Sequence, residues 1–173
     1  MVWDRQINLK TSEELEKMRT AGRINAEALA AAHAILRPGV TTADLNAAAE
    51  DVLKKYGVYS PFKNYPGPYP YPASTTVSVN EELVHGIPSK KRKLKEGDIV
   101  SVDCGTVFEG YVGDSAFTAG VGEVSPETQR LLEVTEMALY AGIAKMVIGN
   151  RVGDVSAAVQ EYAESRGFFV TRE

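Results

Sequence analysis

The sequence predicts an α+β protein in which helices pack on one face of an antiparallel sheet. Three observations carry this prediction. Two stretches with apolar residues at helical spacing come first, short alternating strands follow, and a second pair of helical stretches comes last. A chain of 173 residues with 44% apolar and 24% charged residues is typical of a globular protein, with one domain or one domain and part of another.

Two helices are predicted in the first part of the chain. The first begins at a T-x-x-E capping box formed by Thr11 and Glu14 and ends before Pro38 and Gly39. The second is predicted over residues 42–56. The apolar stripe of the first helix, taken at helical spacing, comprises Leu15, Met18, Gly22, Leu29, Ala32 and Leu36.

An irregular loop is predicted between these helices and the sheet. Residues 59–74, YSPFKNYPGPYPYPAS, contain five prolines, and proline fixes φ and lacks an amide donor. The tyrosines among them favour a packed loop rather than a polyproline II ligand for a recognition domain. The stretches TTVSV, DIVSVDCG and GYVGDSAFTAGVG then predict an antiparallel sheet.

A second helix pair is predicted after the sheet. One helix begins at Ser125-Pro126-Glu127 and ends near Gly149, and the other runs over residues 153–166, before the strand-like run FFVTRE. Residues 148–168 repeat the pattern of residues 38–58 without gaps, so the chain is expected to repeat a helix–helix–sheet design. The expected division is 1–123, a first half with two helices and a sheet, and 124–173, a helix pair that opens a second half.

Two carboxylates interrupt the apolar strands. A turn centred on residues 108–109 puts Asp103 opposite Asp114, whereas a turn centred on residues 109–110 shifts them by two positions, and both registers keep them on one face. Gly113 allows close backbone approach. Two like charges this close need a divalent cation, a shared proton or full solvation, and the spacing leaves all three open.

The two histidines differ in context. His85 lies at the end of the preceding strand, before a turn, so it can serve as a ligand, a proton donor or a hydrogen-bond donor to a substrate carbonyl. His33 lies among alanines in the first helix and is interpreted as structural or surface.

Charge and composition exclude several classes. The net charge of −4 gives no general attraction to nucleic acid.

The basic run Lys90, Lys91, Arg92 and Lys93 is interpreted as a solvated hairpin loop, with a ribosome contact as the alternative. The lone Cys104 favours a reducing compartment, and the absence of a leader-like or membrane-length apolar run favours the cytoplasm and no membrane partner.

SVNEELVHGIPS, followed by a hairpin and then EGDIVSVDCGTVFEGYVGDSAFTAGVG, resembles the N-terminal half of type I methionine aminopeptidases, and the likeness runs from about Lys10 onward. The resemblance implies the pita-bread fold, in which two pseudo-symmetric halves enclose two divalent metal ions, taken from Co, Mn, Fe or Zn. It implies removal of N-terminal methionine from peptides and nascent proteins.

The resemblance also implies roles for five residues. Asp103 and Asp114 match the metal-binding carboxylates. His85 matches the residue that contacts substrate rather than metal, which makes it the catalytic and substrate-binding histidine. Tyr71 and Thr76 match the wall of the methionine pocket.

The family's remaining ligands, a histidine and two glutamates, come from a second half that would follow Glu173. The chain alone is therefore expected to be a weak catalyst or none. It is interpreted as a truncated form, one piece of a split enzyme, or a half-fold whose two copies pair. The partner would be the other half or a second copy. Alternatives in function are a non-catalytic pita-bread binding module and a related peptidase acting at X-Pro bonds.

Overall fold

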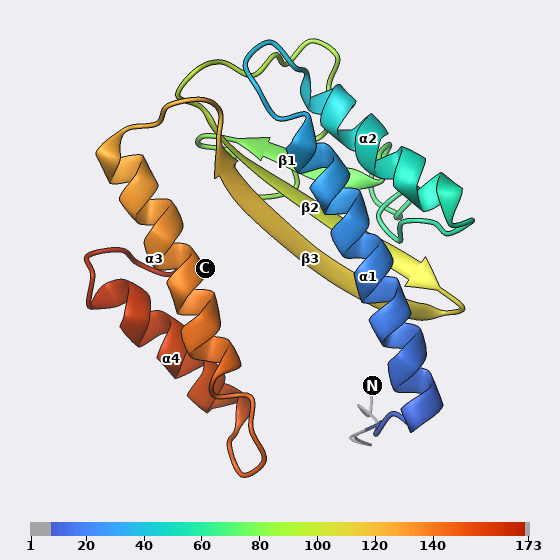
Figure 1. Cartoon of the computed structure of the whole chain (residues 1–173), viewed down its shortest axis with the longest axis vertical. Coiled ribbons are helices and arrows are strands. Elements are labelled where there is room, and N and C mark those ends of the chain that lie inside the picture. Colours follow the sequence, from blue (N-terminus) through green and yellow to red (C-terminus); the bar gives the residue numbers. More distant parts are fainter. Residues whose placement is uncertain (1–7, 172–173) are drawn as a thin grey trace. The chain divides into compact units, whose positions relative to one another are not determined.

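The structure, a computed structural model, describes residues 8–171 (Figure 1). The first seven residues, on which the prediction about a leader partly rests, lie outside this range. The chain divides into two compact units, with the boundary between Gly122 and Glu123.

Two capped helices open the first unit. Helix α1 spans Ser12–Ala34 and α2 spans Thr42–Lys55. At the start of α1, the Thr11 amide donates to Glu14 Oε2 at 2.7 Å and the Glu14 amide donates to the threonine hydroxyl at 3.2 Å. Thr41 begins α2 with the same reciprocal pair. The predicted capping box of α1 is therefore confirmed, and its side-chain bonds satisfy donors that the helix leaves open.

Three strands form one antiparallel sheet in the order β1-β2-β3. Their bounds are Thr75–Val79 for β1, Ile99–Phe108 for β2 and Tyr111–Gly120 for β3. Residues 109 and 110 both have positive φ, 48° and 84°, as a two-residue hairpin turn of the primed type requires. The second of the two predicted registers is the one adopted.

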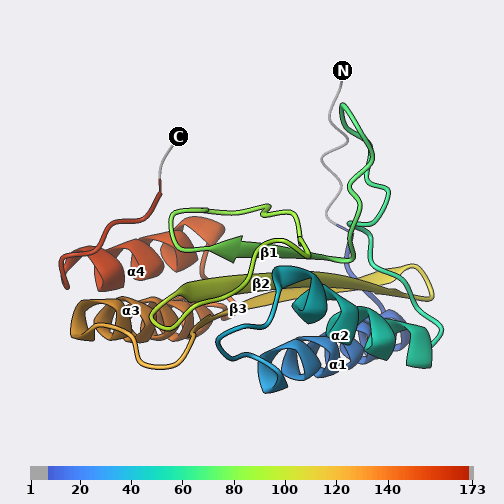
Figure 2. The same cartoon turned by 90° about the horizontal axis from the view of Figure 1, so that it is seen from above.

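The core lies between the sheet and the two helices. Both α1 and α2 cover the same face, while residues 60–74, here termed the Tyr–Pro loop, lie on the other (Figure 2). Alternate strand residues therefore point into the core. The β1–β2 connection returns to the helix side, where Lys93 bridges Thr41 and Leu94 is buried in the core. The buried apolar side chains of this layer include Leu45, Val77, Val79, Leu94, Val100 and Val102.

The predicted stripe of α1 is correct in its second half and wrong in its first. Leu29 is buried, with 7% of its surface exposed, whereas Leu15 is 40% and Met18 36% exposed. Beside this end of α1 lies the β2–β3 turn, where Tyr111 donates to Glu14 Oε1 at 2.8 Å. Polar contacts with a turn replace apolar burial there, and helical spacing does not distinguish the two.

Asn25 is a buried polar residue in α1 that spacing did not single out. It is 1% exposed, donates from Nδ2 to Ser115 Oγ at 2.8 Å, and accepts from Thr106 Oγ1 at 2.9 Å. One amide thus ties α1 to both β2 and β3. A buried amide with both partners in place contributes to stability and to a unique register.

Replacing Asn25 with alanine is expected to lower the free energy of unfolding by about 2 to 3 kcal/mol, because the fully buried Thr106 hydroxyl loses its acceptor and a cavity is left. Urea unfolding followed by circular dichroism measures this. Arg23→Ala, at an exposed position of the same helix, should change stability by less than about 0.5 kcal/mol. Equal losses in both variants would contradict the role given to Asn25.

The second unit is a helix pair. Helix α3 spans Pro126–Ile143, begins at the N-cap Ser125 and has proline at its first position, as expected. It ends before Gly149, because residues 144–149 form turns rather than helix. Helix α4 spans Val152–Glu164. Residues 168–171 form no strand, contrary to the expectation for FFVTRE, whose last two residues lie outside the described range.

The two helix pairs share local geometry at the predicted offset. Gly39 and Gly149 both have positive φ, 89° and 99°. Asp44 accepts from the Thr41 amide at 2.8 Å, and Asp154 accepts from the Arg151 amide at 2.7 Å. These matched turns and caps indicate that the sequence repeat reflects a repeated helix–helix unit.

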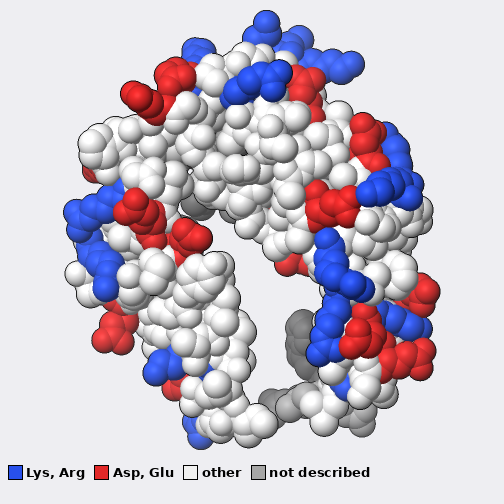
Figure 3. All heavy atoms as spheres, in the orientation of Figure 1, with Lys and Arg blue, Asp and Glu red and all other residues white. Residues whose placement is uncertain are grey.

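Two further expectations concern surfaces. Within the described residues, no helix is long and apolar enough to cross a membrane. The basic run of the β1–β2 connection is exposed at all four positions, Lys90, Lys91, Arg92 and Lys93. Figure 3 shows the lysine and arginine side chains on one face of the molecule. The exposure of the basic run agrees with a solvated loop, and the ribosome contact stays a prediction.

Candidate metal centre

Asp103 and Asp114 lie on the sheet face that α1 and α2 leave uncovered. Asp103 pairs with Ala116 across β2 and β3, and Asp114 pairs with Gly105. Residues two positions apart on paired strands share a face, and Asp114 raises the pKa of the Asp103 carboxyl. The structure thus brings these residues together. The sheet is less covered than expected on this face, because Asp114 is exposed while Asp103 is half-buried.

The proximity of the two groups changes the proton affinity of Asp103. Burial raises the pKa of its carboxyl to about 6, and the charge of Asp114 and the hydrogen bond between the two add to that effect. The charge of His85 and the backbone N–H of Cys104 act in the opposite direction. A carboxylate pair in this state is stabilised either by a proton or by a cation placed between its oxygens.

His85 lies in the loop after β1 rather than at the end of a strand, which corrects the prediction. It is exposed and has φ 61°, which is uncommon for a residue with a side chain. The next residue explains this conformation. Gly86 lies against β1, where its carbonyl accepts from the Val77 amide at 2.8 Å and its amide donates to Ser78 Oγ at 3.1 Å.

Gly86 has no room for a side chain, because a Cβ there would lie 2.2 Å from the Val77 carbonyl oxygen. The loop therefore folds back tightly on β1, and this contact sets the place of His85. The Tyr71 hydroxyl donates to the Gly86 carbonyl, and the charge of His85 lowers the pKa of Asp103.

Tyr71 and Thr76 lie beside the same pair. Thr76 is paired with Asp103 in the β1–β2 register, so its side chain shares that face, and it is 7% exposed. The Tyr71 hydroxyl is within donating distance of the Gly86 carbonyl at 3.0 Å and the Thr75 carbonyl at 3.1 Å. Burial and then the charge of Asp103 raise the pKa of Tyr71 to about 12, so its hydroxyl keeps its proton.

All five predicted site residues therefore gather around one patch of the open sheet face. His33, in contrast, packs edge-on against Phe117 on the helix side, with ring centroids 5.1 Å apart. Its interpretation as a structural residue agrees with this contact.

The two carboxylates supply only part of a coordination shell. Among residues 8–171, no group of three or more His, Cys, Asp or Glu side chains is placed to hold a metal ion. Asp103 and Asp114 nevertheless fit the role of ligands, because hard carboxylate oxygens at a shared point suit divalent cations. A metal ion at this face would need further ligands, beyond those that residues 8–171 place there.

Paired carboxylates of this kind on a sheet face are typical of metal-dependent hydrolases. Residues 16–173 match the model of metallopeptidase family M24, and the chain belongs to this family. The methionine aminopeptidase of Clostridium acetobutylicum is 50% identical over 167 residues, which cover 96% of this chain and 66% of that protein. That of Aquifex aeolicus is 44% identical and is covered to 64%. The chain thus spans slightly less than two thirds of the length of these relatives.

Solved structures agree. The methionine aminopeptidase of Thermotoga maritima superposes with a TM-score of 0.91 at 45% identity, covering 97% of this chain and 66% of that chain. The prolidase of Pyrococcus furiosus has a TM-score of 0.78 at 22% identity, which shows the shared fold. The resemblance to type I methionine aminopeptidases and the α+β, pita-bread class are confirmed. Divalent metal ions belong to the chemistry of a metallopeptidase family.

Proposed function

We propose that the chain provides the first half of a methionine aminopeptidase active site, which removes N-terminal methionine from peptides and nascent proteins in the cytoplasm. The observation that carries this proposal is the carboxylate pair Asp103 and Asp114, on one face of the sheet, inside a chain similar to methionine aminopeptidases over nearly its whole length.

Each residue has a distinct role in this proposal. Asp103 and Asp114 would hold two divalent ions, of Co, Mn, Fe or Zn. Such ions, when bound, supply an activated water at neutral pH and polarise the scissile carbonyl. His85 binds the substrate backbone by a hydrogen bond from the edge of the site. Tyr71 and Thr76 form the wall for the methionine side chain, and the half-buried, protonated Tyr71 hydroxyl keeps that wall in place through its carbonyl contacts.

The proposed partner of this half is a second sheet-bearing half. The helix pair α3–α4 carries large apolar side chains with open surfaces, among them Leu139 at 56% and Val152 at 83% exposure. In the matching position of α1, Leu29 is buried under the sheet. A sheet packed on α3–α4 would bury the equivalent surface and bring the remaining ligands to the site.

Calorimetric titration of the metal-free chain with Co²⁺ and Mn²⁺, followed by hydrolysis of Met-Gly-Gly, tests the proposal. We expect metal uptake that Asp103→Asn removes, with slow or no hydrolysis by the chain alone and faster hydrolysis once a second half is supplied. Absence of metal uptake would refute the ligand assignment. Hydrolysis of an X-Pro peptide in preference to the methionyl peptide would refute the substrate.

A further inference from the structure

The Tyr–Pro loop, residues 60–74, frames the candidate site but has little secondary structure of its own. Its five prolines cannot donate to a ladder, and two of its backbone bonds join Asn64 to Tyr71 at 2.8 Å and Tyr71 to Tyr65 at 3.1 Å. Figure 2 shows it projecting from the open side of the sheet. Something outside the loop must fix its position.

Both ends of the loop touch the surroundings of the carboxylate pair. At the first end, Pro61 and Phe62 cover Gly105, the strand partner of Asp114, so closely that a Cβ there would lie 2.9 Å from Pro61 Cγ. Toward the last end, the Tyr71 hydroxyl donates to the Gly86 carbonyl at 3.0 Å, in the loop that carries His85, and to the Thr75 carbonyl at 3.1 Å, next to the site residue Thr76. The position of this loop therefore determines the shape of the site on two sides.

The loop does not pack closely against the C-terminal half of α2. A pocket of about 390 Å³ lies there, lined by Leu53 and Val58 on one side and Lys63 and Asn64 on the other. Across this space, polar contacts join the loop to α2.

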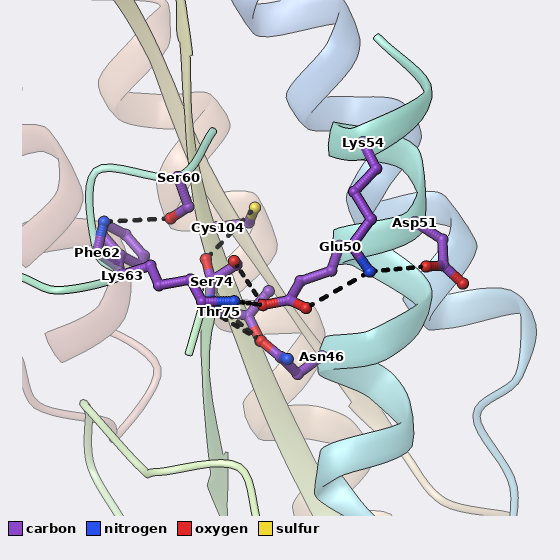
Figure 4. A network of polar contacts seen from close by, with 10 residues as sticks. All are labelled: Asn46, Glu50, Asp51, Lys54, Ser60, Phe62, Lys63, Ser74, Thr75 and Cys104. Carbon is purple, nitrogen blue, oxygen red and sulfur yellow. Dashed lines mark hydrogen bonds and ion pairs between the residues drawn. The ribbon is translucent and has the colours of Figure 1, made fainter. Parts of the chain in front are cut away.

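Two residues of α2, one helical turn apart, make these contacts (Figure 4). Asn46 Oδ1 accepts from the amides of Ser74 and Thr75, both at 3.0 Å, and from the Thr75 hydroxyl at 3.1 Å. Glu50 Oε1 accepts from Lys63 Nζ at 2.7 Å and from Ser74 Oγ at 2.8 Å. One residue thus holds the end of the loop, and the other joins its beginning to its end.

Glu50 is suited to this task by its environment. Its side chain is 17% exposed, so its charge is less screened than that of a surface carboxylate. Burial by itself raises the pKa of Glu50, but the hydrogen bonds from Lys63 and Ser74 outweigh it and hold the pKa below its usual value. The carboxylate is therefore charged at neutral pH, when its bond to the Lys63 ammonium is strongest.

We propose that Asn46 and Glu50 are positioning residues, which set the wall of the candidate site by fixing both ends of the Tyr–Pro loop from α2. They lie on the helix side of the molecule and act on the site through Ser74 and Lys63. The link to methionine recognition rests on the proposed function, whereas the positioning of the loop does not.

Amide hydrogen exchange on the full chain tests the positioning. In Asn46→Ala and Glu50→Gln, the amides of Asn64, Tyr71, Ser74 and Thr75 should exchange about fivefold to tenfold faster, the change that follows loss of one ordinary hydrogen bond. Asp51→Asn is the matched control, because Asp51 lies on the same helix, is 76% exposed and pairs with Lys54. Its loop amides should exchange at the wild-type rate.

Amides of the β2–β3 ladder serve as an internal reference. If the loop amides keep their wild-type rate in both variants, or if loop and ladder amides accelerate by the same factor, the positioning role is refuted. The second result would mean that Asn46 and Glu50 act on global stability only.

Binding of L-methionine, followed by NMR shifts of the tyrosine rings, tests the link to the site. The dissociation constant should rise about fivefold in Asn46→Ala and stay unchanged in Asp51→Asn. If methionine binds the wild-type chain and the variant equally well, the loop does not shape the pocket and the proposal fails. If methionine does not bind the wild-type chain, the proposed function fails at this point, while the exchange experiment still decides the positioning.

Discussion

Replacing Asp103 with asparagine is expected to remove divalent metal binding and, at the same time, to stabilise the metal-free protein at pH 7. The metal loses one of its two carboxylate ligands from this chain. The apoprotein loses a half-buried negative charge that shares a sheet face with the charge of Asp114. The shift in the pKa of Asp103, allowing for partial solvent screening, corresponds to about 1 to 2 kcal/mol.

The sign follows from proton linkage. The pKa of Asp103 is about 6 in the folded protein, against 3.8 for an unperturbed aspartate. Between these values the folded protein binds more protons than the unfolded chain, so the free energy of unfolding falls as pH rises through this window. The contribution of Asp103 is therefore most favourable below about pH 4 and is lost above about pH 6.

Urea unfolding in the presence of EDTA, at pH 4, 5, 6 and 7, measures this dependence. As the pH rises from 4 to 7, the free energy of unfolding of the wild-type protein should lose the contribution of Asp103. The Asp103→Asn variant should show no such loss. Asp98→Asn is a control of opposite sign. Although burial raises the pKa of Asp98, hydrogen bonds from Asn80 and the Lys95 amide hold it below its usual value. That variant should be less stable than the wild type at pH 7, and a gain there would contradict the electrostatic argument.

Replacing Gly113 with alanine is expected to lower the free energy of unfolding by about 3 kcal/mol. A Cβ at this position would lie 2.5 Å from the Gly22 amide nitrogen and 2.7 Å from the Ala21 carbonyl carbon. Both are backbone atoms of α1, so no side chain can move aside, and α1 must separate from β3. Because residue 113 precedes Asp114, we also expect weaker metal binding.

Gly22→Ala is the matched control at the same contact. A Cβ at Gly22 would meet no atom within 4 Å, and alanine has a higher helix propensity than glycine, so this variant should gain about 0.5 to 1 kcal/mol. Thermal unfolding of both variants gives the comparison. If Gly113→Ala proves as stable as Gly22→Ala, the close approach of α1 to β3 is not present in solution.

Local signals in the sequence predicted most elements and the shared face of the two carboxylates, whereas Tyr71 and Thr76 were assigned only from the family resemblance. The capping box of Thr11 and the proline after Ser125 fixed helix starts, because each depends only on neighbours along the chain. The period of two along both strands predicted that Asp103 and Asp114 share a face in either register, and this did not require knowing which turn forms.

Tertiary structure decided what depends on residues far apart in sequence. Leu15 and Met18 are exposed, although they follow the same helical spacing as the buried Leu29. At their end of α1, the β2–β3 turn makes polar contacts, such as that of Tyr111 with Glu14. Only the return of the loop onto β1, with Gly86 against Val77, brings His85 toward Asp103. Asn25, Asn46 and Glu50 carry no local signal for these roles, since the strand and loop partners named above are 13 to 90 positions away. Periodicity reports how an element is patterned, whereas burial and hydrogen bonding are set by the partner that the fold supplies.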